Sequence, residues 1–157
     1  MQSHSNQSAS MQPYFRLLIA LAASYGVMFL VGYARTDIFE NVFLNLNRFY
    51  MTGMMVAPML IIMLLAMGSM YQNKTLNAVL IGVGVVLTLL FWSLVRQQVG
   101  VGNQQFLRSM IPHHAAAILV CNQAALTDPR IEDLCTEIIA AQEREIREMK
   151  ALMQDVA

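Results

Sequence analysis

The chain has 157 residues, of which 57% are hydrophobic and 13% charged, and its formal net charge is zero. No cluster of Lys and Arg is present to form a nucleic-acid-binding surface, and two cysteines are too few for a disulfide scaffold. The charge is unevenly placed, because residues 1–102 hold five basic and two acidic side chains, whereas residues 103–157 hold five basic and eight acidic ones. The composition therefore predicts an apolar, membrane-embedded N-terminal part followed by a polar tail, with no nucleic-acid partner.

The first twelve residues are rich in Ser and Gln and show no hydrophobic periodicity. Such a composition cannot bury enough apolar surface to fold, so we expect residues 1–12 to be a disordered tail. The apolar stretch that follows, residues 14–34, is too long for the hydrophobic region of a cleaved signal peptide. We therefore interpret it as an uncleaved membrane anchor.

Residues 13–99 contain three apolar stretches. No charged residue lies between Arg48 and Lys74, and none lies between Lys74 and Arg96. Each stretch reaches the ~20 apolar residues that a helix needs to cross a bilayer, and only helices satisfy their own backbone in lipid. The sequence therefore predicts an all-α protein with three transmembrane helices, joined in part by a short loop over residues 35–48.

The second of these stretches is rich in methionine. Four of its methionines, Met55, Met59, Met63 and Met67, recur every four residues and form a stripe on one side of a helix. A stripe of thioethers is a possible relay for Cu(I) or Ag(I), but flexible methionines also fill gaps between helices and lipid. Transport pathways usually contain polar groups within the membrane, and no charged residue accompanies this stripe, so we favour packing.

Residues 103–157 predict an antiparallel helical hairpin, which we expect to be a separate metal-binding domain. Apolar residues recur at three- and four-residue steps on both sides of Thr127-Asp128-Pro129, where Thr127 or Asp128 caps the second helix and Pro129 begins it. Counting equal steps from this turn pairs His114 with Gln142. The second helix is expected to bury Ile131, Leu134, Cys135, Ile138, Ile139, Gln142, Ile146, Met149 and Met153.

The same counting places Cys121 opposite Cys135. In a cytoplasmic tail the two cysteines stay reduced and pack as small apolar residues, whereas in a periplasmic tail they can form a disulfide. Of these alternatives we favour two buried thiols.

Sulfur and imidazole side chains recur on the facing sides of the two predicted helices. Thioethers and imidazoles together prefer Cu(I), and by extension Ag(I), over hard cations. The alternative is that these side chains pack the core and that the hairpin docks a partner protein without metal. The predicted metal ligands are Met110, His113, His114 and Met149, with Gln142 and Glu145 as their hydrogen-bonding neighbours.

His113 and His114 diverge by about 100° around the helix axis, so a monomer offers only one of them to a given ion. The other imidazole can then serve a second subunit. One amphipathic hairpin cannot bury its apolar faces alone, and two hairpins can form a four-helix bundle. We therefore expect a homodimer formed through the hairpin.

Two enzymatic alternatives lack their motifs. A di-iron carboxylate site requires Glu-x-x-His, and a zinc hydrolase of the common helical type requires His-Glu-x-x-His. The sequence contains neither motif. We therefore expect a binding protein rather than an enzyme.

The tail also resembles a known family. The run from Arg108 to Ile118, which contains Met110-Ile-Pro-His-His114, is followed by Asp128-Pro129-Arg130 and by Gln142-x-x-Glu-Ile-x-x-Met149. These strings resemble the family called domain of unknown function 305, which is ferritin-like and helical and includes CopM-type copper-binding proteins. The resemblance covers about residues 103–154, and the three apolar stretches resemble the membrane-attached bacterial branch of that family. It implies that Met110, His113, His114 and Met149 bind copper.

The expected function is therefore copper or silver handling by a multi-pass protein of a bacterial inner membrane. Four basic residues (Arg35, Arg48, Arg96, Arg108) flank the spans on the tail side and two (Arg16, Lys74) on the other, which favours a cytoplasmic hairpin. The soluble copper binders of the resembling family are exported, which favours the opposite side. The orientation stays open, as do the physiological metal and the direction of any transfer.

Overall fold

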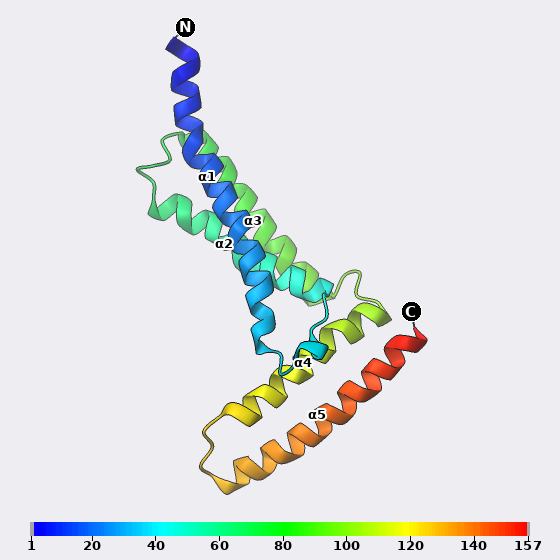
Figure 1. Cartoon of the computed structure of the whole chain (residues 1–157). Helices are drawn as coiled ribbons and strands as arrows, with labels where there is room; N and C mark the ends of the chain where they lie inside the picture. Colours follow the sequence, from blue (N-terminus) through cyan, green and yellow to red (C-terminus); the bar gives the residue numbers. More distant parts are fainter. Residues whose placement is uncertain (1, 157) are drawn as a thin grey trace. The chain divides into compact units, whose positions relative to one another are not determined.

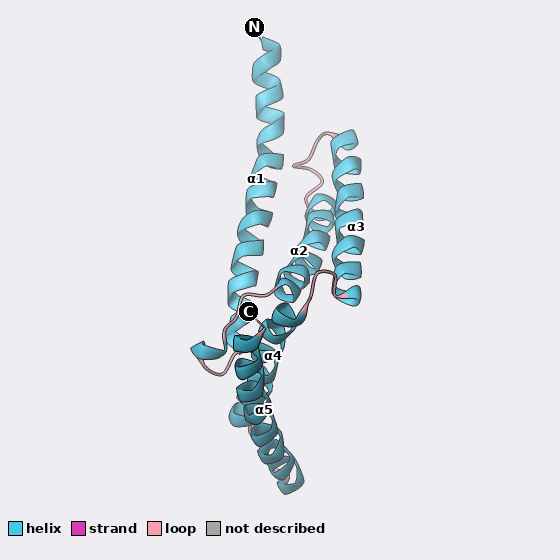
Figure 2. Ribbon diagram, turned by 90° about the vertical axis from the view of Figure 1, so that its right-hand side faces the viewer, coloured by secondary structure: helices cyan, strands magenta, loops and turns pink. Residues whose placement is uncertain are grey.

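The computed structural model describes residues 2–156, with side chains from residue 11 onward, and these residues form an all-α protein (Figures 1 and 2). Contacts divide them into two compact units, which we call the membrane unit (residues up to Phe29, and Phe49–Val99) and the hairpin unit (Leu30–Arg48, and residues from Gly100 onward). The described helices are α1 (Gln2–Val31), η1 (Gly32–Arg35), η2 (Phe39–Asn41), α2 (Leu46–Ala66), α3 (Lys74–Gln97), α4 (Asn103–Gln123) and α5 (Pro129–Asp155), of which η1 and η2 are short 3₁₀ helices.

The prediction of three helices long and apolar enough to cross a membrane is confirmed. These segments are Met11–Arg35, Leu46–Ala66 and Lys74–Gln97. In the first and third segments only 6% of the most apolar window is buried within the protein, against 33% in the second. The side chains of α1 and α3 therefore point mostly outward, which is the arrangement expected of helices whose surroundings are lipid.

The helices of the membrane unit contact one another at one end around two tyrosines. Tyr14 and Leu17 of α1 pack with Leu60 and Leu64 of α2 and with Tyr71 of the α2–α3 connection. Elsewhere α2 and α3 approach closely at small residues. A Cβ placed on Gly84 of α3 would come within 2.7 Å of the Ile61 side chain, so this contact requires a residue without a side chain.

The structure extends α1 through residues 2–12, where the composition predicts a disordered tail; Met1 lies outside the described residues. The physical reason is cooperativity, because adding residues to an existing helix is far easier than nucleating a new one. A second difference concerns α2, which ends at Ala66. Met67 therefore follows the helix, so the predicted methionine stripe ends at Met63 within α2.

The predicted hairpin is confirmed, and in Figure 1 α4 and α5 run antiparallel, side by side. Ile111 and Ala115 of α4 are 0% exposed and form the centre of the hairpin core. The Asp128 side chain accepts a hydrogen bond from the Arg130 backbone N–H at 3.0 Å, and Pro129 begins α5. The start of α5 and its capping residue are therefore as predicted.

The hairpin core is smaller than predicted on the α5 side. Ile146 and Met149 are buried as expected, but Ile131 is 47% and Leu134 is 53% exposed. Two helices bury only the stripe along which they touch, and the predicted set is wider than one stripe. The prediction that Ile131 and Leu134 are buried is therefore wrong for this chain taken alone.

The connection between α1 and α2 packs against α4 within the hairpin unit. The Asn45 side chain donates a hydrogen bond to the Arg108 carbonyl at 3.4 Å, and the Gln105 side chain accepts one from the Leu46 backbone N–H at 3.0 Å. Phe43 packs against the hairpin core. The sequence predicts only a short loop here, whereas the structure makes it a third layer of the hairpin unit.

Candidate metal site on the helical hairpin

A disulfide joins α4 to α5 near their connecting turn. Cys121 and Cys135 are bonded, with their Cα atoms 5.4 Å apart, which confirms the predicted pairing of these positions across the hairpin. The prediction of two packed thiols is wrong in this structure. The register that brings the cysteines together also brings their sulfur atoms within bonding distance, and an oxidising environment is then sufficient to join them.

His114 is the most constrained of the predicted ligands. Its side chain is only 12% exposed, and both ring nitrogens have partners. Nδ1 lies 2.8 Å from the Met110 carbonyl oxygen, and Nε2 lies 2.8 Å from the Glu145 carboxylate. A carbonyl can only accept, so Nδ1 carries a proton and donates it. Nε2 is therefore the nitrogen that can either donate to Glu145 or bind a metal ion.

Glu145 takes the place that the sequence gives to Gln142. The equal-step count pairs His114 with Gln142, but Gln142 makes no side-chain hydrogen bond among the described residues. Helical side chains lean toward the N-terminus of their own helix. His114 therefore leans away from the turn and Glu145 leans toward it, so the two meet although Glu145 lies almost a turn beyond the counted position.

His113 lies beside His114 but in a different environment. Its side chain is exposed, and the two imidazole rings form an edge-on pair with centroids 5.8 Å apart. One histidine is thus held within the hairpin while its neighbour remains open to solvent. This difference follows from the 100° step between consecutive helical residues.

The two predicted methionine ligands come from opposite helices and meet in the hairpin core. Met149 of α5 is 9% exposed, and Met110 of α4 is partly buried against the same cluster. Met110 also provides the carbonyl that orients His114. The structure therefore places Met110 and Met149 on the hairpin core and joins His114 to Glu145, with the exposed His113 beside His114.

The side chains of Met110, His114 and Met149 include donor atoms that suit a soft metal ion in part. No group of three or more His, Cys, Asp or Glu side chains in the described part of the chain is arranged to hold a metal ion. A metal ion at Nε2 of His114 would therefore depend on thioether sulfur as well. Two thioethers and one imidazole bind Cu(I) or Ag(I) in preference to Mg²⁺ or Ca²⁺.

Comparison with known proteins supports the resemblance seen in the tail. The family model described as Domain of unknown function (DUF305) matches residues 93–155. An uncharacterized protein of Acanthamoeba polyphaga mimivirus is 31% identical over 134 residues, which cover 81% of this chain and 86% of that protein. The chain belongs to the DUF305 family. No solved structure matches it.

The two comparisons cover different parts of the molecule. The DUF305 model spans the end of α3 and all of α4 and α5. The similarity to the mimivirus protein extends over more than twice as many residues, so it includes part of the apolar region as well.

Proposed function

We propose that this DUF305 protein is a membrane-anchored binder of Cu(I) or Ag(I) and that the α4–α5 hairpin holds the ion. The observation that carries the proposal is the orientation of His114. Its Nδ1 donates to the Met110 carbonyl, which fixes the ring and directs Nε2 toward Glu145. Metal-binding histidines are commonly held in this way, with one nitrogen on a carbonyl and the other on the metal.

Each predicted ligand has a defined role in the proposal. Nε2 of His114 binds the ion, and Met110 and Met149 supply thioether sulfur from the two helices. The exposed imidazole of His113 is the route by which an ion arrives or leaves. Glu145 holds Nε2 when no ion is bound and lies beside it when one is. The role is binding, and it includes no catalytic step.

The disulfide supports a hairpin on the oxidising side of the membrane. Disulfides persist outside the cytosol, and Cys121–Cys135 is formed in this structure. The count of flanking basic residues favours the opposite orientation. The positive-inside rule is a statistical bias, however, whereas a disulfide requires an oxidising compartment. We therefore propose that the hairpin faces the compartment in which disulfides are stable.

The exposed apolar residues of the hairpin support a homodimer. Phe106 and Val120 of α4 and Leu134 and Leu152 of α5 are each about half exposed. A second hairpin packed against this surface would complete a four-helix bundle and remove these side chains from water. The same exposed residues favour a second candidate function, in which the hairpin docks a different protein and binds no metal.

A silver titration of the full-length protein in detergent separates the two functions. Silver is the better probe because Cu(I) requires a reductant, which would also open the disulfide. We expect wild type to bind Ag(I), Met110→Leu to bind it more than tenfold more weakly, and His113→Ala/His114→Ala to lose the site, since even outer neighbours of a metal contribute about 10–100-fold. Leu has nearly the volume of Met, so packing is preserved.

The matched control is Met153→Leu. Met153 is also a partly buried methionine packed on the hairpin core, but it is not in the proposed ligand set. We expect this variant to bind Ag(I) as wild type does. Equal affinities for wild type, Met110→Leu and the double histidine variant would overturn metal binding and favour the docking function.

A further inference from the structure

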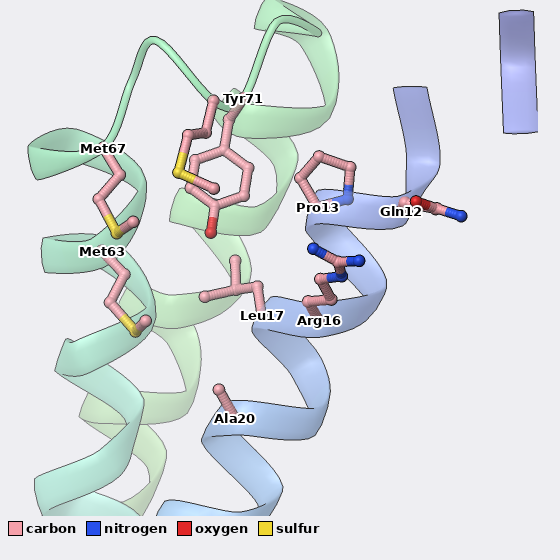
Figure 3. A pocket seen from close by; sticks show the side chains of 9 residues that line it. Gln12, Pro13, Arg16, Leu17, Ala20, Met63, Met67 and Tyr71 are labelled. Carbon is pink, nitrogen blue, oxygen red and sulfur yellow. The ribbon is translucent and has the colours of Figure 1, made fainter. Parts of the chain in front are cut away.

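The membrane unit contains a cavity of about 270 Å³ between residues 12–20 of α1 and the end of α2, next to the α2–α3 connection. Figure 3 shows its walls, with Arg16 and Leu17 projecting from α1 and Met63 and Met67 from the α2 side. Its volume is close to the lower end of the ~300–1,000 Å³ range of ligand pockets. The cavity lies entirely within the membrane unit, and the proposed metal site has no part in it.

Tyr71 is a buried residue whose hydroxyl is directed into this cavity. The residue is only 4% exposed, and its ring packs on Tyr14 with centroids 5.2 Å apart. The Tyr14 hydroxyl donates to the Asn77 side chain at 2.7 Å and accepts from the Asn73 backbone N–H. By contrast, the Tyr71 hydroxyl points into the cavity in Figure 3 and has no hydrogen-bond partner among residues 11–156. A tyrosine hydroxyl that opens into the cavity and has no partner within the protein can donate a hydrogen bond to a ligand there.

Arg16 provides a positive charge at the same cavity. It lies in the first two turns of the Met11–Arg35 segment and makes no ion pair among the side chains that the structure describes. A guanidinium has five donors and no acceptor, and its fork matches the oxygens of a phosphate. A cationic ligand is disfavoured here, because the Arg16 charge would repel it.

We propose that this cavity binds one membrane phospholipid. Arg16 holds the phosphate, the Tyr71 hydroxyl donates to an ester carbonyl, and part of one acyl chain lies along Leu17, Ala20 and Met63. Arg16 and the Tyr71 hydroxyl both offer donors to the cavity, and a phospholipid presents acceptors at the head and apolar chain below it. Methionine is a flexible apolar wall that adapts to such a chain. The cavity holds only a segment of the lipid, and the remainder stays in the bilayer.

Native mass spectrometry of the delipidated, full-length protein tests this proposal. The probes are phosphatidylglycerol, a diacylglycerol with the same chains, and inorganic phosphate. We expect one phosphatidylglycerol to be retained, the diacylglycerol to be lost, and excess inorganic phosphate not to compete. Competition by inorganic phosphate would make the cavity a site for the free anion and would overturn the lipid proposal.

Two variants address the two ends of the lipid. Arg16→Gln should weaken phosphatidylglycerol retention about tenfold, the usual loss for a charge-assisted hydrogen bond. Ala20→Leu should weaken it by filling the apolar wall while leaving Arg16 in place. The control is Arg96→Gln, which removes an arginine from the end of α3 and should leave retention unchanged.

Other outcomes overturn the proposal. Equal retention by wild type, Arg16→Gln and Ala20→Leu would show that the lipid adheres to the spans without using the cavity. Retention of the diacylglycerol as firmly as phosphatidylglycerol would show that the phosphate is not recognised and would also overturn the proposal. Circular dichroism of each variant establishes that the helices are intact.

Discussion

The membrane unit and the hairpin unit both expose large apolar side chains, but we expect different surroundings for these side chains in the two units. Val86 of α3 is 63% exposed and Leu134 of α5 is 53% exposed. The first lies in a segment apolar enough to span a bilayer, where we expect lipid to cover it. The second lies on a helix rich in charged residues, where we expect water to surround it. We therefore propose a partner protein only for the exposed apolar residues of the hairpin unit.

The two units also differ in what holds them together. Each unit has one large side chain that is fully buried, Ile111 in the hairpin unit and Leu17 in the membrane unit, and each has a capped helix start, but the disulfide belongs to the hairpin unit. The membrane unit has a cavity beside its buried cluster around Tyr14 and Leu17. Side-chain deletions should therefore be costly in the hairpin core and nearly neutral on the outer faces of the spans.

The largest expected effect comes from Ile111→Ala. Ile111 is 0% exposed at the centre of the hairpin core, and truncating such a residue costs about 2–5 kcal/mol of stability. Val86→Ala is the matched change on an exposed face of α3 and should cost less than about 0.5 kcal/mol. Hydrogen exchange of α4, α5 and α3 amides measures both. Comparable losses of protection in the two variants would contradict the distinction between the units.

The next effect concerns the disulfide. Cys121 and Cys135 are 14 residues apart, and closing a loop of about 15 residues stabilises a fold by about 3 kcal/mol in the chain-entropy account. Cys121→Ser/Cys135→Ser should lower amide protection most strongly near the α4–α5 turn. Wild type treated with a reductant is the control and should match the variant. Unchanged protection in both samples would show that the hairpin does not depend on this bond.

The sequence predicts the local features of both units and misses the features that depend on distant contacts. The three spans follow from runs of apolar residues, and the start of α5 follows from Asp128-Pro129. The pairing of Cys121 with Cys135 follows from counting along two helices. The packing of residues 30–48 on α4 cannot be read in this way, because it depends on contacts such as Asn45 with Arg108, which are 63 residues apart.

The candidate site shows the same limit at the scale of single side chains. The helix faces of Met110, His114 and Met149 can be predicted from their spacing. The contact of His114 with Glu145 rather than with Gln142 cannot be predicted in this way, because it depends on the direction in which each side chain leans. The redox state of the cysteines depends on the compartment, which composition alone does not define.

Leu134→Glu should have a smaller effect on hairpin stability, but it should change the oligomeric mass of the protein. A charge on this exposed apolar position should prevent two hairpins from packing and convert the proposed dimer to a monomer. Thr136→Glu is the control, because Thr136 is exposed and lies about 200° around α5 from Leu134. Mass photometry of the detergent-solubilised protein measures the change. If the wild-type protein is already a monomer, the proposed homodimer is wrong.

The smallest effect concerns the cap of α5. Hydrogen bonds from the Arg130 guanidinium, and then from its backbone N–H, lower the pKa of the Asp128 carboxyl below its usual value. The folded state therefore favours the ionised form, and this stabilisation is complete above the unfolded-state pKa of about 4 and is lost as the pH falls below it. Asp128→Ala should lower the melting temperature of the hairpin slightly at pH 7, and the difference from wild type should shrink in acid. A pH-independent difference would contradict this origin.

X-ray absorption at the silver edge, on the full-length protein loaded with one equivalent of Ag(I), tests the central claim most directly. The account predicts a mixed environment, with sulfur from Met110 and Met149 and an imidazole nitrogen from His114. In Met110→Leu the sulfur contribution should fall while the nitrogen contribution remains, and the disulfide stays intact throughout. Silver that is not retained, or a sulfur signal that is the same in wild type and Met110→Leu, would contradict metal binding by the hairpin.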